Sequence, residues 1–202
     1  MLVTDPAMTA RRGLVDTVAE AVAGGVTIVQ LRDKDAPDAA LVELGRALMA
    51  ALAPHRIPLI VNDRPAAARA LGAAGLHIGQ EDGDPAAARA TIGPDAILGL
   101  SVTHAGEIDT VDARLVDYVG LGPVFASATK ADAAPPLGLD GVAAVGAGLP
   151  VPFVGIGGID AGNAAAVMAA GAAGIAVISA ICGAPHPRSA AAALRALVER
   201  PR

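Results

Sequence analysis

Short apolar runs alternate with longer, Ala-rich segments along the whole chain. Eight of these runs are nearly all apolar and rich in β-branched residues, which is typical of parallel strands buried on both faces. They are Leu2–Val3, Val26–Leu31, Leu59–Val61, Gly75–Ile78, Ile97–Leu100, Tyr118–Leu121, Val151–Ile156 and Gly174–Ile178. The segments between them have helical patterning and span residues 12–23, 38–53, 65–73, 85–92, 104–115, 139–147, 160–170 and 188–199.

Strict alternation of eight strands with eight helices predicts an α/β protein with the architecture of a (β/α)8 TIM barrel. The chain has 202 residues, which is close to the minimum for this fold. We therefore expect a single domain over residues 1–202 with few insertions. An open, doubly wound sheet, which usually has fewer units, is the alternative. No G-x-G-x-x-G motif follows an early strand, which weakens the dinucleotide-binding version of that alternative.

Polar residues and glycines follow almost every predicted strand, whereas Ala, Gly and Pro precede the opposite ends. Solvent alone would favour polar residues equally at both ends. In a barrel the carboxyl ends of all strands open on one face, so we expect these groups to converge on a single bowl. They include Thr4–Asp5, Gln30, Arg32, Lys34, Asn62–Asp63, His77, residues 79–82, Ser101, Thr103, Gly122, residues 127–130, Gly157–Gly158 and Ser179.

Gln30, Arg32 and Lys34 come at alternate positions from the end of the second strand. Residues with this spacing project to one side of an extended chain. Two cations and an amide on one side suit a diphosphate or a carboxylate. The alternative is a solvated loop end in which Asp33 and Asp35 neutralise the cations.

Carboxylates follow the third and fourth predicted strands, which are neighbours in a barrel. Asp63 after the third strand and Glu81 or Asp82 after the fourth could hold Mg²⁺ between them while phosphate oxygens and waters complete its octahedron. The alternative for Asp63 is a helix N-cap before Pro65, and Glu81 with Asp82 could form an ordinary acidic turn.

Two further features suit the binding of anions. Lys130 ends a loop of small residues and could fold that loop over an anion as a lid, although an exposed lysine is the alternative. Gly157–Gly158 and Ser179 follow the seventh and eighth strands, where backbone N–H groups of barrels form a recurrent phosphate site. The glycine pair could instead serve only a tight turn.

Composition limits the classes of partner. A net charge of −5, with one Tyr, two Phe and no Trp, argues against a nucleic-acid surface. The single Cys182 cannot form an intramolecular disulfide, and no secretory signal precedes the first strand, so we expect a cytoplasmic protein. The uncharged segment Ala164–Ala184 changes its apolar period midway, which favours a buried helix followed by a strand over a membrane span.

No Ser–His–Asp order, nucleophile elbow or Walker loop occurs in the chain. His77 alternates with apolar neighbours and is interpreted as a strand residue rather than a base. His104 stands at a predicted helix start, where it could cap the helix or contact solvent, and Cys182 is interpreted as a small buried apolar residue.

A series of blocks carries a more specific signal over nearly the whole chain. They are Val3–Asp5, Gly25–Lys34, Val61–Arg64, Leu76–Asp82, Ser101, Gly120–Phe125, Thr129–Lys130, Pro135–Gly138, Gly155–Ile159 and Val177–Ile181. In these blocks and their order the sequence resembles the thiamine phosphate synthase (thiamine-phosphate pyrophosphorylase) family.

The resemblance implies a small barrel that joins 4-amino-2-methyl-5-hydroxymethylpyrimidine diphosphate to hydroxyethylthiazole phosphate, with Mg²⁺ as cofactor, giving thiamine phosphate and pyrophosphate. It implies a pyrimidine diphosphate site of Gln30, Arg32, Lys34, Asn62, Ser101 and Lys130, with Mg²⁺ on Asp63 and Asp82. The residues it places around the thiazole phosphate are Ser127, Ala128, Thr129, Gly158, Ile178 and Ser179. The groups it places on the leaving diphosphate, and hence in catalysis, are Arg32, Lys34, Ser101 and Lys130. Cations and Mg²⁺ around a diphosphate stabilise a leaving group, so we expect a dissociative substitution.

Two rival functions use the same barrel. The similar thiazole tautomerases need no diphosphate or metal site, and a non-catalytic barrel would only bind thiazole phosphate. The complete set of cations and carboxylates favours the synthase, as does Pro123 where tautomerases can carry a histidine base. Ser127 departs from the Thr-x-Thr-Lys pattern of the family but keeps the hydroxyl. The expected partners are small molecules, with neither nucleic acid nor membrane, and a homodimer is left open.

Overall fold

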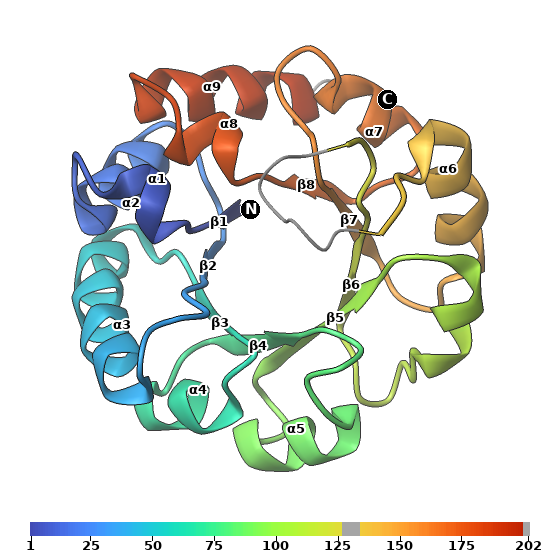
Figure 1. Cartoon of the computed structure of the whole chain (residues 1–202), viewed down its shortest axis with the longest axis horizontal. Coiled ribbons are helices and arrows are strands. Elements are labelled where there is room, and N and C mark those ends of the chain that lie inside the picture. The colour runs from blue at the N-terminus through green and yellow to red at the C-terminus, as the bar shows by residue number, and fades with distance from the viewer. Residues whose placement is uncertain (127–133, 200–202) are drawn as a thin grey trace.

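The computed structural model of the chain describes residues 1–126 and 134–199. At its centre is a sheet of eight parallel strands, whose order in space is their order in the chain (Figure 1). The strands are β1 (Leu2–Val3), β2 (Val29–Leu31), β3 (Leu59–Asn62), β4 (Gly75–Ile78), β5 (Ile97–Val102), β6 (Tyr118–Leu121), β7 (Phe153–Ile156) and β8 (Gly174–Ala176).

Hydrogen bonds between the first and last strands close the sheet into a barrel. Leu2 pairs in parallel with Val177, the residue that follows β8. The Val3 N–H donates to the Val177 carbonyl at 3.0 Å, and the Val177 N–H donates to the Met1 carbonyl at 3.2 Å. Both edges of the sheet are paired in this way, so the predicted barrel is confirmed and the open, doubly wound sheet is wrong.

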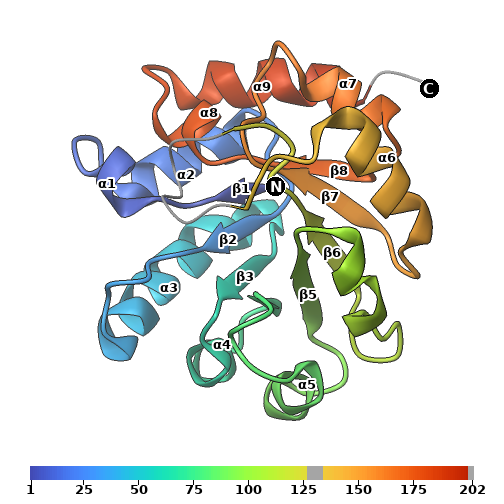
Figure 2. The ribbon, with the colours of Figure 1, turned by 45° about the vertical axis from the view of Figure 1, so that its right-hand side comes forward.

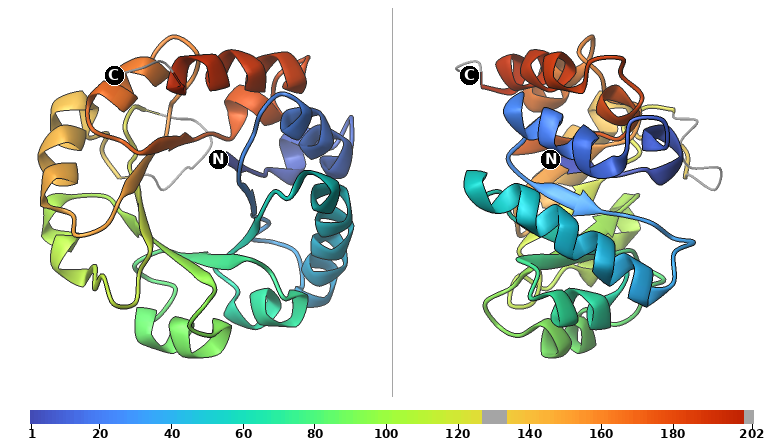
Figure 3. Two further views of the ribbon diagram at one scale, coloured as in Figure 1. Left: turned by 180° about the vertical axis from the view of Figure 1, so that it is seen from behind. Right: turned by 90° about the vertical axis from the view of Figure 1, so that its left-hand side faces the viewer.

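Helices form a ring outside the strands, which can be followed from the front and from behind (Figures 1 and 3), while Figure 2 shows the strands side by side. They are α1 (Pro6–Thr9), α2 (Leu14–Ala23), α3 (Asp38–Leu52), α4 (Pro65–Leu71), α5 (Pro85–Ile92), α6 (Gly138–Gly148), α7 (Ala164–Ala169), α8 (Ser179–Cys182) and α9 (Pro187–Val198). Two short 3-10 helices, Ala53–His55 and Ala105–Thr110, complete the described elements.

The helical ring closes where α2 packs on α9. Each helix turns an apolar stripe inward: α2 buries Val18 and Val22, and α9 buries Leu194. The contact requires a glycine after α2, because a Cβ on Gly24 would lie 2.2 Å from the Arg188 carbonyl oxygen. Small residues therefore let the first and last helices approach closely.

The second strand and one of the predicted helices differ clearly from the observed elements. The second strand begins at Val29 rather than Val26, because residues 24–26 still belong to the turn that ends α2, where the Val26 N–H donates to the Ala21 carbonyl. The predicted helix at 104–115 is wrong, since only a 3-10 helix forms there. The Asp112 carboxylate accepts from the Arg114 N–H at 2.9 Å and favours a turn instead of a further helical turn.

The uncharged segment Ala164–Ala184 contains α7, β8 and α8, so the prediction of a helix followed by a strand is confirmed. The helix α8 was missed, as was α1, because four residues are too few to set up a helical period. Within residues 1–126 and 134–199, no helix combines the length and the apolar character that a membrane crossing requires.

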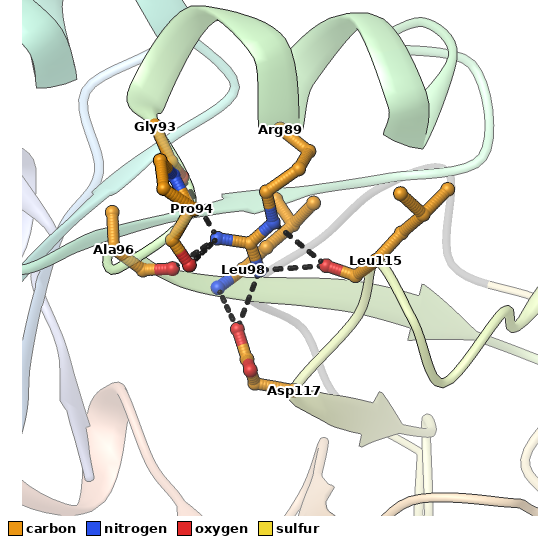
Figure 4. A network of polar contacts seen from close by, with 7 residues as sticks. All are labelled: Arg89, Gly93, Pro94, Ala96, Leu98, Leu115 and Asp117. Carbon is orange, nitrogen blue, oxygen red and sulfur yellow. Dashed lines mark hydrogen bonds and ion pairs between the residues drawn. The ribbon is translucent and has the colours of Figure 1, made fainter.

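Arg89 on α5 ties together the amino-terminal ends of β5 and β6 (Figure 4). Its Nε and Nη2 donate to the Leu115 carbonyl at 3.0 and 2.6 Å, and Nη1 donates to the Gly93 carbonyl at 3.1 Å. Nη2 also donates to Asp117 Oδ2 at 2.7 Å, and the same carboxylate oxygen accepts from the Leu98 N–H at 2.7 Å. With its side chain only 14% exposed, this one guanidinium satisfies acceptors from three segments.

We expect Arg89→Met to lower the free energy of unfolding by about 3 kcal/mol, because it leaves several shielded carbonyls and the Asp117 carboxylate without their donor. Urea unfolding measures the loss. Arg46→Met is the matched control: Arg46 forms an exposed ion pair with Glu43 on α3, so its removal should change stability by less than about 0.5 kcal/mol. Equal losses in the two variants would contradict the importance of the Arg89 network.

Candidate active site

A cavity of about 190 Å³ opens at the carboxyl ends of the strands. Ten of the residues predicted for the site line it, and they come from six different strands or the loops that follow them. They are Gln30, Arg32, Lys34, Asn62, Asp63, Asp82, Ser101, Gly158, Ile178 and Ser179. The other four, Ser127, Ala128, Thr129 and Lys130, lie outside the described residues.

Thr4 holds the cationic segment after β2 in place. Its buried hydroxyl donates to the Arg32 carbonyl at 3.2 Å and accepts from the Arg32 N–H at 2.9 Å. The Thr4 N–H also donates to the Gln30 carbonyl at 2.9 Å. These bonds extend the β1–β2 pairing past the end of the strand, so the alternate side chains of Gln30 and Arg32 both reach the cavity.

Lys34 lies further out and its side chain is half exposed. Its Nζ is 3.9 Å from Asp63 Oδ2 across the rim. Asp33 shapes the loop, since its carboxylate accepts from the N–H groups of Asp35 and Ala36 at 3.2 and 3.1 Å. Lys34 therefore faces the carboxylates of the cavity, and Asp33 serves the loop backbone.

Arg64 anchors the same loop from the next strand. Its Nη2 donates to the Lys34 carbonyl at 3.0 Å, and its Nη1 forms an ion pair with Asp38 at the start of α3. Because Arg64 directly precedes α4, its guanidinium connects the loop after β2 to the loop after β3. This connection limits the movement of Lys34 relative to β3.

The alternative that Asp63 caps the following helix is wrong. The N-cap position of α4 is Arg64, and no side chain caps that helix. Asp63 has a φ of 60°, an uncommon conformation for a residue with a side chain, and its N–H donates to the His77 carbonyl at 2.8 Å. Such strained backbone is concentrated at functional sites, and here it turns the carboxylate toward the cavity.

Asp63 and Asp82 form a carboxyl pair at the rim. Burial first, and then the adjacent Asp82, raise the pKa of Asp63 to about 6, while Lys34 opposes the shift. Burial opposes the shift of Asp82, but hydrogen bonds with Asp63 and with the Gly79 N–H, at 2.7 Å to the latter, lower its pKa. Two carboxyls that share a proton in this way are a favourable place for a cation.

The donor set of this pair fits Mg²⁺. Carboxylate oxygens are the protein ligands this ion prefers, and it usually takes one or two of them, with waters and phosphate oxygens in the remaining positions. Within the described residues, no group of three or more Cys, His, Asp or Glu could hold a metal ion. The carboxyl pair is thus suited to an ion that arrives with a phosphorylated ligand rather than to an all-protein cage.

Gly157–Gly158 follows β7 and forms another wall of the cavity. Gly158 has a φ of 65°, and a Cβ there would lie 2.7 Å from both the Ala126 carbonyl oxygen and the Phe125 Cβ. The Phe125 N–H donates to the Gly157 carbonyl at 3.0 Å, and Asn163 Nδ2 donates to the Gly158 carbonyl at 2.9 Å. The turn needs glycine, as the alternative held, and the same turn lines the cavity, where a phosphate site stays a prediction.

His77 is a strand residue and it lines the cavity, both as predicted, but its hydrogen-bonded position there was not predicted. Its ring bridges Ser101 on β5 and Tyr118 on β6. One feature of the sequence indicates this position of His77. Gly99 and Gly120 lie on the next two strands, where small residues leave room for a large inward side chain such as the imidazole.

His104 and Cys182, which were also interpreted as structural residues, lie as expected. His104 is the N-cap of the 3-10 helix Ala105–Thr110, and its Nδ1 accepts from the Gly106 N–H at 3.1 Å. Cys182 is buried, and burial raises the pKa of its thiol to about 11.

Comparisons with known proteins agree with this arrangement. Residues 1–181 match the family model described as thiamine monophosphate synthase. A thiamine-phosphate synthase of Azorhizobium caulinodans is 54% identical over 201 residues, which are 100% of this chain and 95% of that protein. One of Xanthobacter autotrophicus is 55% identical over 98% of this chain and 93% of the relative. A thiamine phosphate pyrophosphorylase structure from Pyrococcus furiosus superposes with a TM-score of 0.89 at 36% identity, covering 98% of this chain and 94% of that one.

Asp63→Asn should make the metal-free protein more stable at pH 8. The pKa of Asp63 is higher in the folded state than its ordinary value of 3.8, so the folded state takes up more protons between pH ~4 and ~6. Stability is therefore lost as the pH rises through that window, by about 1–3 kcal/mol, and the amide removes this loss. Urea unfolding in EDTA at pH 4 and pH 8 measures it. Asp16→Asn, an exposed carboxylate on α2, should keep the wild-type pH dependence; an Asp63→Asn variant that also keeps it would contradict the carboxyl pair.

Proposed function

The chain belongs to the thiamine monophosphate synthase family, and on that premise we propose that its cavity joins the aminopyrimidine diphosphate to the thiazole phosphate, releasing pyrophosphate. The observation that supports the site most directly is the convergence of two cations, two carboxyls and the glycine turn after β7 on one cavity. Relatives with the synthase name cover the whole chain, and they give no support to the metal-free isomerase or to a non-catalytic barrel.

Gln30, Arg32, Lys34 and Asn62 bind the pyrimidine diphosphate in this proposal. Arg32 is half-buried and held at its backbone by Thr4, and its planar guanidinium offers forked donors to phosphate oxygens. Lys34 lies at the exposed rim, where a mobile ammonium can follow the outer phosphate. Gln30 and Asn62 lie deeper on β2 and β3 and present amides to the pyrimidine.

The reaction proposed for this site is a dissociative substitution. The bond between the pyrimidine methylene carbon and the bridging oxygen breaks, and its electron pair leaves with the diphosphate. The electron-rich aminopyrimidine supports the methylene cation that remains, and the lone pair of the thiazole nitrogen then forms the new C–N bond. Arg32, Lys34 and Ser101 stabilise the charge that develops on the leaving oxygens, so the protein contributes electrostatics and positioning.

Asp63 and Asp82 would hold Mg²⁺ in the proposed complex. When bound, this ion would supply charge neutralisation at the diphosphate. Asp63 is set for that role by its unusual backbone conformation, and Asp82 by the hydrogen bond from Gly79. The positive charges of Lys34 and the ion would share the same anionic ligand.

Gly158, Ile178 and Ser179 are the proposed thiazole phosphate residues among those described. Gly158 and Ser179 follow adjacent strands, β7 and β8, so the backbone of the first and the hydroxyl of the second can meet one phosphate group. Ser127, Ala128, Thr129 and Lys130 are proposed to complete the two anion sites, with Lys130 on the diphosphate.

The proposed setting follows from composition. An acidic chain with a single buried cysteine suits small phosphorylated ligands in a reducing, cytoplasmic compartment, without nucleic acid or membrane as partner. A homodimer remains a prediction that sedimentation of the purified protein can test.

The direct test mixes the purified protein with both substrates and Mg²⁺. We expect thiamine phosphate and pyrophosphate in equal amounts, with loss of both in EDTA. Arg32→Ala should slow a single turnover by a factor of about 10²–10³, because it removes one donor to the leaving group. Arg46→Ala, on the outer face of α3, is the control and should keep the wild-type rate. Binding of both substrates without product would overturn the proposal, and a rate within threefold of wild type would remove Arg32 from the site.

Gly158→Ala separates the two substrate sites. The new methyl group would collide with Phe125 and with the Ala126 carbonyl, and the turn after β7 must shift. We expect the KM for thiazole phosphate to rise about tenfold and the KM for pyrimidine diphosphate to stay within about twofold. Gly72→Ala is the control, since Gly72 has a similar φ of 61° with no atom within 4 Å of the added Cβ. An equal rise in both KM values would place Gly158 elsewhere in the reaction.

A further inference from the structure

A chain of polar side chains crosses the interior of the barrel beneath the cations. The imidazole of His77 on β4 lies at its centre: Nε2 is 3.0 Å from Ser101 Oγ, and Nδ1 is 2.9 Å from Tyr118 Oη. His77 is only 8% exposed. Ser101 and His77 line the cavity, so the Ser101 hydroxyl is the end of the chain that faces a ligand.

The neighbouring strands are built to admit this ring. A Cβ on Gly99 would lie 2.4 Å from His77 Nδ1 and 2.3 Å from Tyr118 Cζ, and a Cβ on Gly120 would lie 3.0 Å from His77 Cε1. Any larger residue at Gly99 would displace the contact between the histidine and the tyrosine. The two glycines therefore leave space for a defined hydrogen-bonded chain rather than for an apolar interior layer.

Both inner members of the chain are neutral. His77 is buried and each of its ring nitrogens faces an uncharged hydroxyl, and burial raises the pKa of Tyr118 well above its ordinary value. A neutral imidazole has one N–H donor and one acceptor nitrogen, so the chain can run in only two directions. If Nε2 donates to Ser101, the Ser101 hydrogen is free to point into the cavity. If Nε2 accepts from Ser101, only oxygen lone pairs face the cavity.

The phenol favours one of these directions. Tyr118 carries an O–H donor and a neutral imidazole nitrogen without hydrogen is an acceptor, so the favourable pairing has Tyr118 donating to His77 Nδ1. His77 Nε2 then carries the ring hydrogen and donates to Ser101.

We propose that Tyr118 and His77 are positioning residues that hold the Ser101 hydroxyl as a hydrogen-bond donor aimed into the cavity, at the oxygen that leaves with the diphosphate. The inference rests on the proposed function, because that function supplies the leaving oxygen. The proposal requires no proton transfer between the side chains of this chain. Tyr118 donates to His77, His77 donates to Ser101, and Ser101 donates to an oxygen whose negative charge grows as the C–O bond breaks, so the contact strengthens as the reaction proceeds.

Tyr118→Phe tests the chain because it removes one hydroxyl and keeps the ring. We expect the single-turnover rate at saturating substrates to fall about tenfold, with both KM values within about twofold, since a misdirected Ser101 loses a contact made in the transition state. Ser101→Ala should cost at least as much. In the Ser101→Ala background, Tyr118→Phe should have no further effect on the rate, because the chain no longer has an end to orient. Independent, multiplicative losses would overturn the proposal.

Thr17→Val is the matched control, because it also deletes a buried hydroxyl, on α2 and outside the cavity. It should lower stability without changing the rate. If Tyr118→Phe fails to fold, the His77 variants replace it: His77→Gln keeps an N–H near the position of Nε2 and should retain most of the rate, whereas His77→Leu should fall as far as Ser101→Ala. Equal rates for these two variants would contradict a donor role for His77.

The tautomer of His77 gives a readout that needs no catalysis. We expect the ¹⁵N spectrum of the metal-free protein at pH 7 to show His77 protonated at Nε2, with the signal assigned by its loss in His77→Gln. Protonation at Nδ1 would reverse the chain and overturn the inference. A wild-type protein that makes no thiamine phosphate would instead overturn the proposed function, and the tautomer measurement would still stand by itself.

Discussion

The hydrogen bonds that join β1 to Val177 close the sheet, and every strand of that closed sheet runs in the same direction. All the carboxyl ends therefore meet at one rim. Arg32 after β2 and Gly158 after β7 are far apart in the chain, yet they line the same cavity because the barrel has no free edge. The amino-terminal ends meet at the opposite rim, where Arg89 ties α5 to β5 and β6. Stability and chemistry thus occupy opposite ends of the same strands.

Among residues 1–126 and 134–199, the opposite charges at the functional rim are only loosely paired. Lys34 approaches Asp63 only to 3.9 Å, and Asp63 shares its hydrogen-bonding capacity with Asp82 instead. Elsewhere the chain pairs its charges closely, as Arg64 does with Asp38. A rim that keeps two carboxyls together and two cations nearby is costly in the free protein, and a multiply charged ligand with its cation offsets that cost.

The fold could be predicted because eight buried strands leave the same short apolar signature eight times. The convergence of polar residues followed from it, since Gln30, Asp63 and Ser101 all come at strand ends. The alternative of Asp63 as a cap and the prediction of a helix over 104–115 were both judged from local sequence. The backbone at Asp63 is fixed by the His77 carbonyl of the next strand, and the Asp112 carboxylate ends the second segment as a turn. The His77 carbonyl lies on another strand and cannot be recognised from local propensity, whereas the turn at Asp112 is a local signal that competes with the helical pattern.

The hydrogen-bonded position of His77 was not predicted, because it too depends on residues of other strands. Alternation placed it correctly on a strand, but it could not say that the inward face of that strand is polar. That property belongs to three strands at once, because Gly99 makes the room, Tyr118 supplies one partner and Ser101 the other. Within the described residues, no buried side-chain nitrogen or oxygen lacks a hydrogen-bond partner. An apolar side chain in place of His77 would fill the space with no polar groups to satisfy, and buried polar groups give little net stability even when paired. This small barrel nevertheless contains an imidazole, a phenol and two glycines in its interior. We infer that the orientation of the Ser101 hydroxyl, as well as packing, determines which residues stand there.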